Sequence, residues 1–513
     1  MEDYLQKILR ARVYDVAVET PLEIAKNLSN RYENQIWLKR EDLQPVFSFK
    51  LRGAYNRMVR LNEDELKKGV IASSAGNHAQ GVALSASHLN CRAVIVMPVT
   101  TPATKVNAVH SLKAEVILHG DTYDESYKEA VRISKKEGLT FIHPFDDPEV
   151  IAGQGTIALE ILNQSEKTPD AIYVAVGGGG LIGGIAAYVK NLWPQIKVIG
   201  VEPEDACAMT LSLKEGKRVV LDDVGLFADG VAVKQVGSNT FGLAQKYVDS
   251  MVTVSTDEIC AAIKDAFEDT RSILEPAGAL AIAGLKADVT TKGLKHQNLV
   301  AVACGANMNF ERLRFVAERA ELGEERESML AVEIEERAGS LKYLCEVLGQ
   351  RSLTEFSYRM SGKTSAQIFM GVELKGSKDR LELINEFKSS GINCLDLSTD
   401  ELSKLHLRHM VGGRLPLSNK SFYGKPYKEL LYRFEFPERP GALMRFLNKL
   451  KSDWSISIFH YRNHGSDIGR IVVGVLVPDE EIDAWRQFLM DLGYKYWNES
   501  DNPAYKLFLG AQT

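Results

Sequence analysis

The sequence lacks the features that mark membrane, secreted and nucleic-acid-binding proteins. No window reaches about 18 uninterrupted apolar residues, and the chain starts with polar and charged residues, so we expect neither a membrane span nor a signal peptide. No basic tract interleaved with aromatic residues occurs, and the formal net charge of -6 disfavours a polyanionic partner. These absences predict a cytoplasmic protein that does not bind nucleic acid.

Cysteine is scarce and scattered. The six cysteines form no CxxC pair, which argues against a disulfide framework and a zinc knuckle. The close histidine pairs, His406 with His409 and His460 with His464, bring no cysteine or carboxylate at ligand spacing, so we expect no metal site. The composition that remains is ordinary, with 45% hydrophobic and 25% charged residues, and a length of 513 residues predicts several domains.

Short β-branched runs alternate with longer amphipathic stretches from residue 36 to residue 315. Strands this apolar, separated by helices, are typical of parallel sheets that are covered on both faces. The first 320 residues are therefore predicted to form an α/β domain with two lobes. The predicted strands are Ile36–Lys39, Gly69–Ala72, Ala93–Met97, Glu115–Leu118, Ala171–Val176, Val198–Val201 and Leu299–Val302, and helical spacing recurs at Ala79–Leu89 and Thr122–Glu137.

An internal repeat follows a charged connector at residues 318–327. The segment Glu336–Leu341 returns as Glu438–Leu443, and Phe356–Arg359 returns as Phe459–Arg462, each about 100 residues later. Each copy reads strand, glycine turn, helix, strand, strand, helix, strand, which is the order of a ferredoxin-like unit. We therefore predict two such domains, at residues 327–399 and 429–502, with a linker at 400–428.

Lys50 lies in the stretch Ser48–Gly53, between the apolar residues Phe49 and Leu51. A lysine placed against apolar surface loses hydration of its charged form, so its pKa falls and a nucleophilic amine becomes available to a carbonyl. Lys50 is therefore a candidate Schiff-base lysine. Taken alone, the stretch favours a surface lysine whose stem lies along the core.

A run of glycines, Gly177–Gly184, directly follows the predicted strand Ala171–Val176. Glycines let backbone N–H groups close around a phosphate, and the N-terminus of the following helix adds partial positive charge. The run therefore predicts an anion site. Its glycines also fit G-x-G-x-x-G, with Glu202 at the end of the next strand, as in nicotinamide dinucleotide sites; a glycine-rich turn without a ligand is the third alternative.

Two further motifs lie at the ends of predicted strands. Ser73–Gly81 offers several N–H donors with serine and asparagine side chains, which suit a carboxylate or a phenolic oxygen, although a plain helix cap has the same composition. Cys304 follows the last core strand, where a thiol would point into the ligand crevice of such a fold. A buried structural cysteine is the alternative.

In this order, the motifs resemble those of the fold type II pyridoxal-phosphate enzymes. The resemblance rests on Ser48–Gly53, Ser74–His78, Gly177–Leu181 and Cys304–Asn307. The repeat looks like a tandem ACT-like regulatory region, and the combination resembles the threonine dehydratase (threonine ammonia-lyase) family over nearly the whole chain. This resemblance displaces the nicotinamide alternative. It implies a two-lobed fold type II catalytic domain at residues 1–320, followed by two α+β ACT-like domains.

The resemblance also implies a role for each motif. Lys50 would carry pyridoxal 5'-phosphate, Asn77 would bond its ring hydroxyl, and Ser74 and His78 lie where the family holds the substrate carboxylate. Cys304 falls where many members have serine, opposite the pyridine nitrogen, and a thiol does not stabilise a charged ring as a carboxylate would, which favours elimination. The cofactor phosphate would be held by Gly177, Gly178, Gly179, Gly180 and Leu181.

Two departures separate the chain from the serine racemases that share these motifs. Those enzymes have a second serine where this chain has Ala75, and they use an acidic metal ligand beyond the position of Glu202, where this chain has Ala206 and Ala208. We therefore expect neither racemisation nor the metal site, and we expect Lys50 to be the only base.

The resemblance implies β-elimination of L-threonine to 2-oxobutanoate and ammonia, the first step of isoleucine biosynthesis, in a homotetramer. Isoleucine would inhibit and valine activate at the C-terminal domains, in pockets beside Gly339 and Gly441. The alternatives are a broader L-serine/L-threonine dehydratase, an amino-acid-sensing protein that has lost catalysis, and a C-terminal part that only dimerises. Candidate pocket side chains, which fit a strand core equally well, are Phe356, Tyr358, Phe459 and Tyr461.

Overall fold

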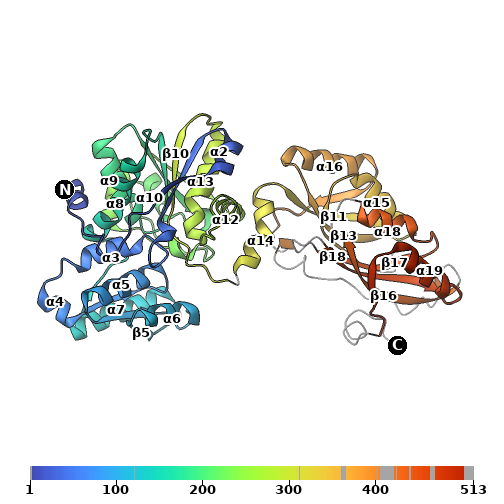
Figure 1. The fold of residues 1–513 in the computed structure, drawn as a ribbon, viewed down its shortest axis with the longest axis horizontal. Coiled ribbons are helices and arrows are strands. Elements are labelled where there is room, and N and C mark those ends of the chain that lie inside the picture. Colours follow the sequence, from blue (N-terminus) through green and yellow to red (C-terminus); the bar gives the residue numbers. More distant parts are fainter. Residues whose placement is uncertain are drawn as a thin grey trace. The chain divides into compact units, whose positions relative to one another are not determined.

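The computed structural model describes residues 3–120, 122–310, 312–359, 365–400, 403–404, 421–422, 425–437, 441–462 and 468–501. The chain divides into two compact units, Met1–Gly323 and Glu324–Thr513 (Figure 1). Most of the predicted linker at 400–428 lies outside the described residues. Within the ranges just given, no helix is long and apolar enough to cross a membrane.

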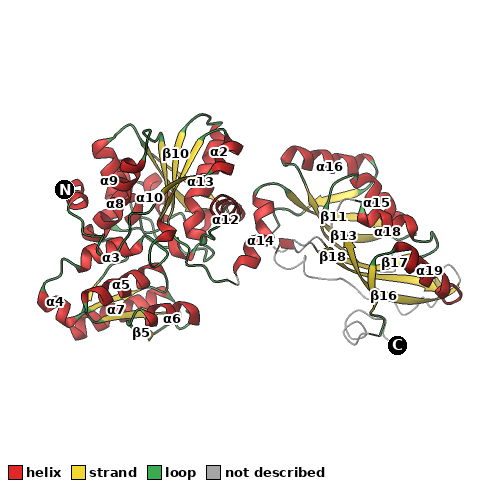
Figure 2. Ribbon diagram, viewed as in Figure 1, coloured by secondary structure: helices red, strands yellow, loops and turns green. Residues whose placement is uncertain are grey.

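The first unit contains a six-stranded and a four-stranded sheet, each covered by helices (Figure 2). All pairings in both sheets are parallel except that of β1 with β2, so the predicted α/β class is confirmed. The larger sheet has the order β1 (Leu22–Ile24), β2 (Gln35–Arg40), β10 (Asn298–Ala303), β7 (Ala171–Ala175), β8 (Lys197–Pro203), β9 (Ser250–Val254). The smaller has the order β5 (Glu115–Leu118), β4 (Ala93–Met97), β3 (Val70–Ser73), β6 (Thr140–Phe141).

Every predicted strand of this unit is present, and the sequence reading missed only strands at sheet edges. The observed central strands β4 and β7 are buried along their whole length, which explains their continuous apolar sequences. In contrast, the missed strands β1, β6 and β9 are partly exposed, and β1 and β6 are only three and two residues long. A strand that is only half covered does not need an apolar run, so its sequence gives little signal.

The helices of the first unit connect and cover these strands. The predicted helices at 79–89 and 122–137 are observed as α5 and α7. Their bounds, in chain order, are α1 (Tyr4–Leu9), α2 (Lys26–Tyr32), α3 (Lys50–Met58), α4 (Glu63–Lys68), α5 (Asn77–Leu89), α6 (Ala103–Ser111), α7 (Tyr123–Glu137), α8 (Pro148–Gln164), α9 (Gly180–Leu192), α10 (Ala208–Glu215), α11 (Ser238–Tyr247), α12 (Thr256–Thr270), α13 (Pro276–Lys292) and α14 (Arg312–Gly323).

The second unit is built on one antiparallel sheet. Its described strands have the order β14 (Asn393–Asp396), β11 (Glu327–Glu335), β13 (Ser365–Glu373), β12 (Leu353–Arg359), β17 (Ser455–Arg462), β18 (Ile468–Pro478), β16 (Lys425–Pro437), β15 (Ser421–Phe422), and β19 (Lys495–Asn498) also pairs with β16. The helices are α15 (Ser340–Leu348), α16 (Ser377–Ser389), α18 (Ala442–Lys449) and α19 (Ile482–Leu492). Each copy of the repeat therefore has the predicted strand–helix–strand–strand–helix–strand order.

The two copies join through their edge strands β12 and β17, which pair antiparallel. In this register Phe356 lies opposite Tyr461, Ser357 opposite His460, and Tyr358 opposite Phe459. Equivalent segments of the two copies thus meet each other, and the pairing removes two exposed sheet edges at once. Phe356 and Phe459 pack edge to face, with ring centres 5.3 Å apart.

Candidate active site

The sequence motifs of the first unit meet at one cavity. Its lining includes Lys50, Asn77, Gly177–Leu181 and Cys304, together with Glu275, which the sequence reading did not single out. The motifs come from the start of α3, the start of α5, the loop between β7 and α9, and the end of β10. Asn77 follows β3 of the smaller sheet, whereas the glycine loop and Cys304 follow β7 and β10 of the larger one, so the cavity is formed at the carboxyl ends of strands from both sheets.

Lys50 is the first residue of α3, and its amine is buried. The amine donates a hydrogen bond to the carbonyl oxygen of Pro144 at 3.1 Å and lies 5.3 Å from the ring centre of Phe49. Burial lowers the pKa of Lys50 to about 8, although the negative charge of Glu275 acts in the opposite direction. The amine therefore loses its proton far more readily than an exposed lysine does.

The glycine loop is packed so closely that it excludes side chains. A Cβ atom on Gly178 would lie 2.2 Å from the ring of Phe145, and one on Gly179 would lie 2.7 Å from the Cε atom of Met209. Gly179 also has a φ of 92°, in the region that favours glycine, and it is the N-cap of α9. The hydroxyl of Thr240 donates to the carbonyl oxygen of Gly178 at 2.6 Å, so the backbone of the loop is fixed. The free N–H groups of the first turn of α9 remain available to an anion.

Asn77, the first residue of α5, is held by two hydrogen bonds. Its Nδ2 donates to Oε1 of Glu275 at 2.5 Å, and its Oδ1 accepts from Nδ2 of Asn307 at 2.7 Å. Asn307 also donates to the carbonyl oxygen of Val46 at 2.8 Å. The amide of Asn77 is therefore fixed in one orientation. Sequence reasoning missed the role of Glu275, because a glutamate before a proline indicates only the start of a helix.

The thiol of Cys304 is buried. The thiol donates to the carbonyl oxygen of Ala277, with the sulfur 3.3 Å from that oxygen. Burial, reinforced by the charge of Glu275, raises the pKa of Cys304 well above its ordinary value. The thiol therefore stays protonated, and it has no negative charge with which to stabilise a charged ring nitrogen.

Ser74 and His78 do not line this cavity. The hydroxyl oxygen of Ser74 accepts from the N–H of Gly76 at 3.2 Å. His78 is buried, and its Nε2 lies 2.9 Å from the carbonyl oxygen of Ile142, to which it donates. Burial lowers the pKa of His78 to about 3, so its ring is neutral and brings no positive charge to a carboxylate. The substrate-binding role of both residues stays a prediction.

Glu202 performs a structural task. Its carboxylate accepts hydrogen bonds from the N–H groups of Met209 and Thr210 and from the hydroxyl of Thr210, at 2.7–2.8 Å, and so caps α10. Burial raises the pKa of Glu202 to about 7. Among the residues that the structure describes, no group of three or more His, Cys, Asp or Glu could hold a metal ion.

Comparison with known proteins identifies the family. A family model described as pyridoxal-phosphate dependent enzyme matches residues 13–305, and one described as the C-terminal regulatory domain of threonine dehydratase matches residues 318–407 and 424–509. The biosynthetic L-threonine dehydratase IlvA of Burkholderia multivorans is 57% identical over 99% of each chain. The chain belongs to the biosynthetic threonine dehydratase family.

Further members of the threonine dehydratase family are similar to this chain over most of their length. The chloroplastic biosynthetic threonine dehydratase of Arabidopsis thaliana is 52% identical over 99% of this chain and 84% of its own length. Among solved structures, the processed form of threonine deaminase isoform 2 from Solanum lycopersicum is 54% identical, covers 62% of this chain and 88% of its own, and has a TM-score of 0.61. The resemblance, the fold class and the dependence on pyridoxal phosphate that the sequence predicted are thereby confirmed.

The residues of the cavity fit pyridoxal phosphate. The glycine loop leaves no space for side chains and presents helix N–H groups to a phosphate, and the lysine amine deprotonates readily enough to bond an aldehyde. The protonated thiol of Cys304 suits a neutral ring nitrogen.

Proposed function

We propose that this dehydratase eliminates the β-hydroxyl of L-threonine and releases 2-oxobutanoate and ammonia, the first step of isoleucine biosynthesis. The observation that carries the proposal is the convergence of Lys50, Asn77, Gly177–Leu181 and Cys304 on one cavity. The names of the relatives, which are biosynthetic threonine dehydratases, support the choice of substrate. Residues 1–320 form the catalytic domain in this proposal, and residues 327–399 and 429–502 form the regulatory domains, with a linker at 400–428.

Each side chain has a defined task in the proposed reaction. When bound, pyridoxal phosphate stabilises the electron pair that remains after removal of the α-proton. The amine of Lys50 would hold the cofactor and would take the α-proton of the substrate. Gly177–Leu181 would bind the phosphate, and Asn77 would donate to the ring oxygen. The neutral thiol of Cys304 would leave the ring nitrogen uncharged, which would favour loss of the β-hydroxyl over transamination.

The face of the substrate opposite Lys50 determines that the enzyme eliminates rather than racemises. Ala75 has no polar atom in its side chain, so it offers no proton from that face. With Lys50 as the only base, a proton is removed and returned on one side. We therefore expect no D-allothreonine, the product of inversion at the α-carbon, among the products.

Release of 2-oxo acid tests the proposal directly. The purified enzyme should release 2-oxobutanoate from L-threonine faster than it releases pyruvate from L-serine, and borohydride reduction should fix the cofactor on Lys50. Faster turnover of L-serine would favour the broader dehydratase. Cofactor binding without release of either product would favour an amino-acid sensor that has lost catalysis, and a label on another lysine would contradict the role of Lys50.

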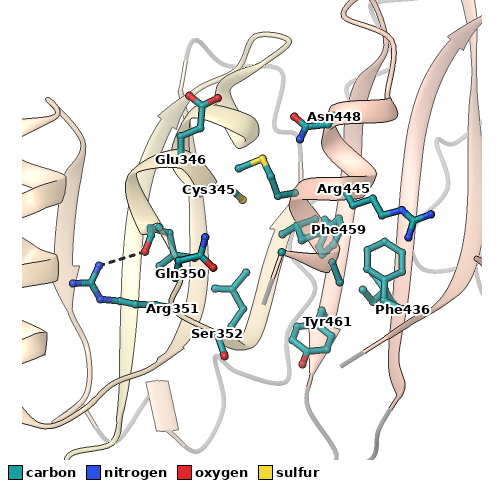
Figure 3. A pocket seen from close by; sticks show the side chains of 18 of the residues that line it. Cys345, Glu346, Gln350, Arg351, Ser352, Phe436, Arg445, Asn448, Phe459 and Tyr461 are labelled. Atoms are coloured by element: carbon teal, nitrogen blue, oxygen red, sulfur yellow. Dashed lines mark hydrogen bonds between the residues drawn. The ribbon is translucent and has the colours of Figure 1, made fainter. Parts of the chain in front are cut away.

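The second unit contains a cavity of about 710 Å³ that suits an amino-acid effector (Figure 3). It lies between the loop after α15, in the first copy, and α18, in the second copy, with Phe459 and Tyr461 from β17. Arg445 and Asn448 of α18 supply polar groups to the same cavity. A cavity of this type combines apolar surface for a branched side chain with polar groups for the amino and carboxyl groups.

Some of the predicted pocket residues line this cavity and others do not. Gly441, Phe459 and Tyr461 line the cavity. Phe356 and Tyr358 do not line it, although all four aromatic side chains belong to the same buried core cluster. Among the described residues, the aromatic side chains that line the cavity all come from the second copy.

Isoleucine, as inhibitor, and valine, as activator, are the effectors of this cavity in our proposal, and the enzyme is a homotetramer. Support comes from the match to the regulatory domain of threonine dehydratase and from the composition of the cavity. An enzyme whose activity responds to neither amino acid at any concentration would leave the second unit as an assembly module.

A further inference from the structure

Glu275 is the N-cap residue of α13, yet its side chain does not cap the helix. An acidic N-cap ordinarily accepts hydrogen bonds from the first free N–H groups of its helix. The side chain of Glu275 is instead 4% exposed and lines the cofactor cavity. A buried carboxylate is costly unless it is hydrogen-bonded, so its place beside the cavity calls for a function other than capping.

The partner of this carboxylate is Asn77. Oε1 of Glu275 accepts from Nδ2 of Asn77, which is 198 residues away in sequence. The hydrogen bonds continue from Oδ1 of Asn77 to Asn307 and from Asn307 to the carbonyl oxygen of Val46. This chain of bonds joins α13, α5, the segment after β10 and the segment just before Lys50. The orientation of the Asn77 amide therefore depends on a partner at each end.

A glycine makes room for the pair. A Cβ atom on Gly305 would lie 2.3 Å from Oε1 of Glu275 and 3.3 Å from Nδ2 of Asn77, which is too close for any side chain. The carbonyl oxygen of Gly305 also accepts from the N–H of Glu275 at 3.1 Å. The end of β10 is thus shaped to hold the carboxylate against Asn77.

The charges around Glu275 balance each other in part. Asp229 repels its carboxylate, whereas Lys105 and Arg312 attract it, and Lys105 also pairs with Asp229 at 2.6 Å. Burial, the largest effect, raises the pKa of Glu275 to about 7. Its charge in turn acts on both Lys50 and Cys304. Glu275 therefore interacts electrostatically both with the charged side chains around the cavity and with Lys50 and Cys304 inside it.

We infer that Glu275 is a positioning residue that orients the amide of Asn77 toward the bound cofactor. Because one N–H of the amide donates to Glu275 and Oδ1 accepts from Asn307, the second N–H is the donor that remains for the ring oxygen of pyridoxal phosphate. The inference rests on the role of Asn77 in the proposed function. It assigns Glu275 no contact with the substrate.

A double-mutant cycle on the full-length enzyme tests this inference. The cycle compares the wild type with Glu275→Ala, Asn77→Ala and the double variant, and it measures the dissociation constant of pyridoxal phosphate and the absorption band of the bound cofactor. Loss of an outer hydrogen-bond partner of this kind weakens binding by about 10-fold or more. If Glu275 acts through Asn77, the double variant should bind the cofactor about as weakly as Asn77→Ala alone.

A structural role for Glu275 would give a different result. If the carboxylate only stabilised α13, its removal would weaken cofactor binding by the same factor with or without Asn77, and this additivity would overturn the inference. Glu275→Gln, whose amide oxygen can still accept from Asn77, should bind the cofactor within about threefold of wild type. Binding as weak as that of Glu275→Ala would count equally against the inference.

Asp288 provides a matched control on the same helix. It is 5% exposed and accepts from the hydroxyl of Tyr173 at 2.8 Å, outside the cofactor cavity. Asp288→Asn should therefore leave cofactor affinity and the absorption band unchanged. Should Glu275→Ala not fold, Glu275→Asp takes its place in the cycle, because the shorter side chain keeps the charge but withdraws from Asn77.

The cofactor readout separates this inference from the proposed function. Binding of pyridoxal phosphate needs no turnover of threonine, so an enzyme that shows the coupling but releases no 2-oxobutanoate would overturn the proposed function alone. Normal threonine turnover with additive effects in the cycle would overturn the inference alone.

Discussion

The two cavities of this enzyme differ in how far they remove charged side chains from water. In the first unit, Lys50, Glu275 and Cys304 line a cavity that desolvates them, and all three pKa values are shifted in consequence. In the second unit, four charged side chains of the cavity lie at exposed positions, namely Glu346, Glu373, Arg445 and Lys449, and the partly buried Arg351 is paired with Asp379 and Glu386. Desolvation strengthens electrostatic interactions, which chemistry requires, whereas a cavity open to water suits reversible binding of an effector.

The architecture of each unit accounts for this difference. Parallel strands bring several loops to one sheet edge, where helices from both sides enclose whatever the loops carry. The antiparallel sheet of the second unit joins two similar copies through β12 and β17, and its cavity opens between the helices α15 and α18 of the two copies. One arrangement encloses a site, and the other forms a groove between equivalent elements.

The largest expected effect is that of Lys50→Ala, which removes the catalytic amine of the first cavity and leaves the second cavity unchanged. Lys50→Ala should lower kcat for L-threonine by at least about 1,000-fold, since it removes both the cofactor attachment and the base. Isoleucine should still bind to this variant, as measured by calorimetry. Lys67, whose side chain is 72% exposed, supplies the control, and Lys67→Ala should keep full activity. A Lys50→Ala enzyme that retained a tenth of the activity would contradict the assignment.

Filling the second cavity should have the converse effect. Met444 of α18 lines the cavity, and Met444→Trp should lower the affinity for isoleucine by about 10-fold or more, because the larger side chain occupies space that the ligand needs. Activity without effector should stay the same. Met490 of α19 is 63% exposed, and Met490→Trp should change neither quantity. Unchanged isoleucine inhibition in Met444→Trp would show that the effector binds elsewhere.

The desolvation of Lys50 predicts a pH dependence for the first cavity. Only the neutral amine bonds the cofactor aldehyde, and burial lowers the pKa of Lys50 to about 8. The rate at which the apoenzyme incorporates pyridoxal phosphate should therefore rise by about tenfold per pH unit below pH 8 and level off above it. Absorbance of the bound cofactor follows this rate. A rate that kept rising up to 10.5, the ordinary lysine value, would mean that the amine is solvated.

The smallest expected effect concerns Cys304. Cys304→Ser should change kcat by less than about threefold, because a hydroxyl is likewise a neutral donor to the ring nitrogen. Steady-state release of 2-oxobutanoate measures the change. A loss of tenfold or more would show that the thiol has a role that serine does not replace.

The sequence predicted most of the fold because its signals are local. Buried parallel strands such as β4 and β7 need continuous apolar runs, and each copy of the repeat carries its own glycine turn. The edge strands β1, β6 and β9 were missed because half-covered strands need no such run. Strands such as β4 and β7, which are buried along their whole length, can therefore be predicted from their apolar runs.

The candidate site shows the same division. By itself the sequence indicated Lys50, the glycine loop and Cys304 as candidates, because four motifs that are ambiguous alone occur together in one order; their roles stay predictions. Only the tertiary structure decided that Glu275 meets Asn77, and that the cavity of the second unit takes its aromatic side chains from one copy of the repeat. Contacts between residues far apart in sequence depend on which elements pack together, and no local pattern encodes that packing.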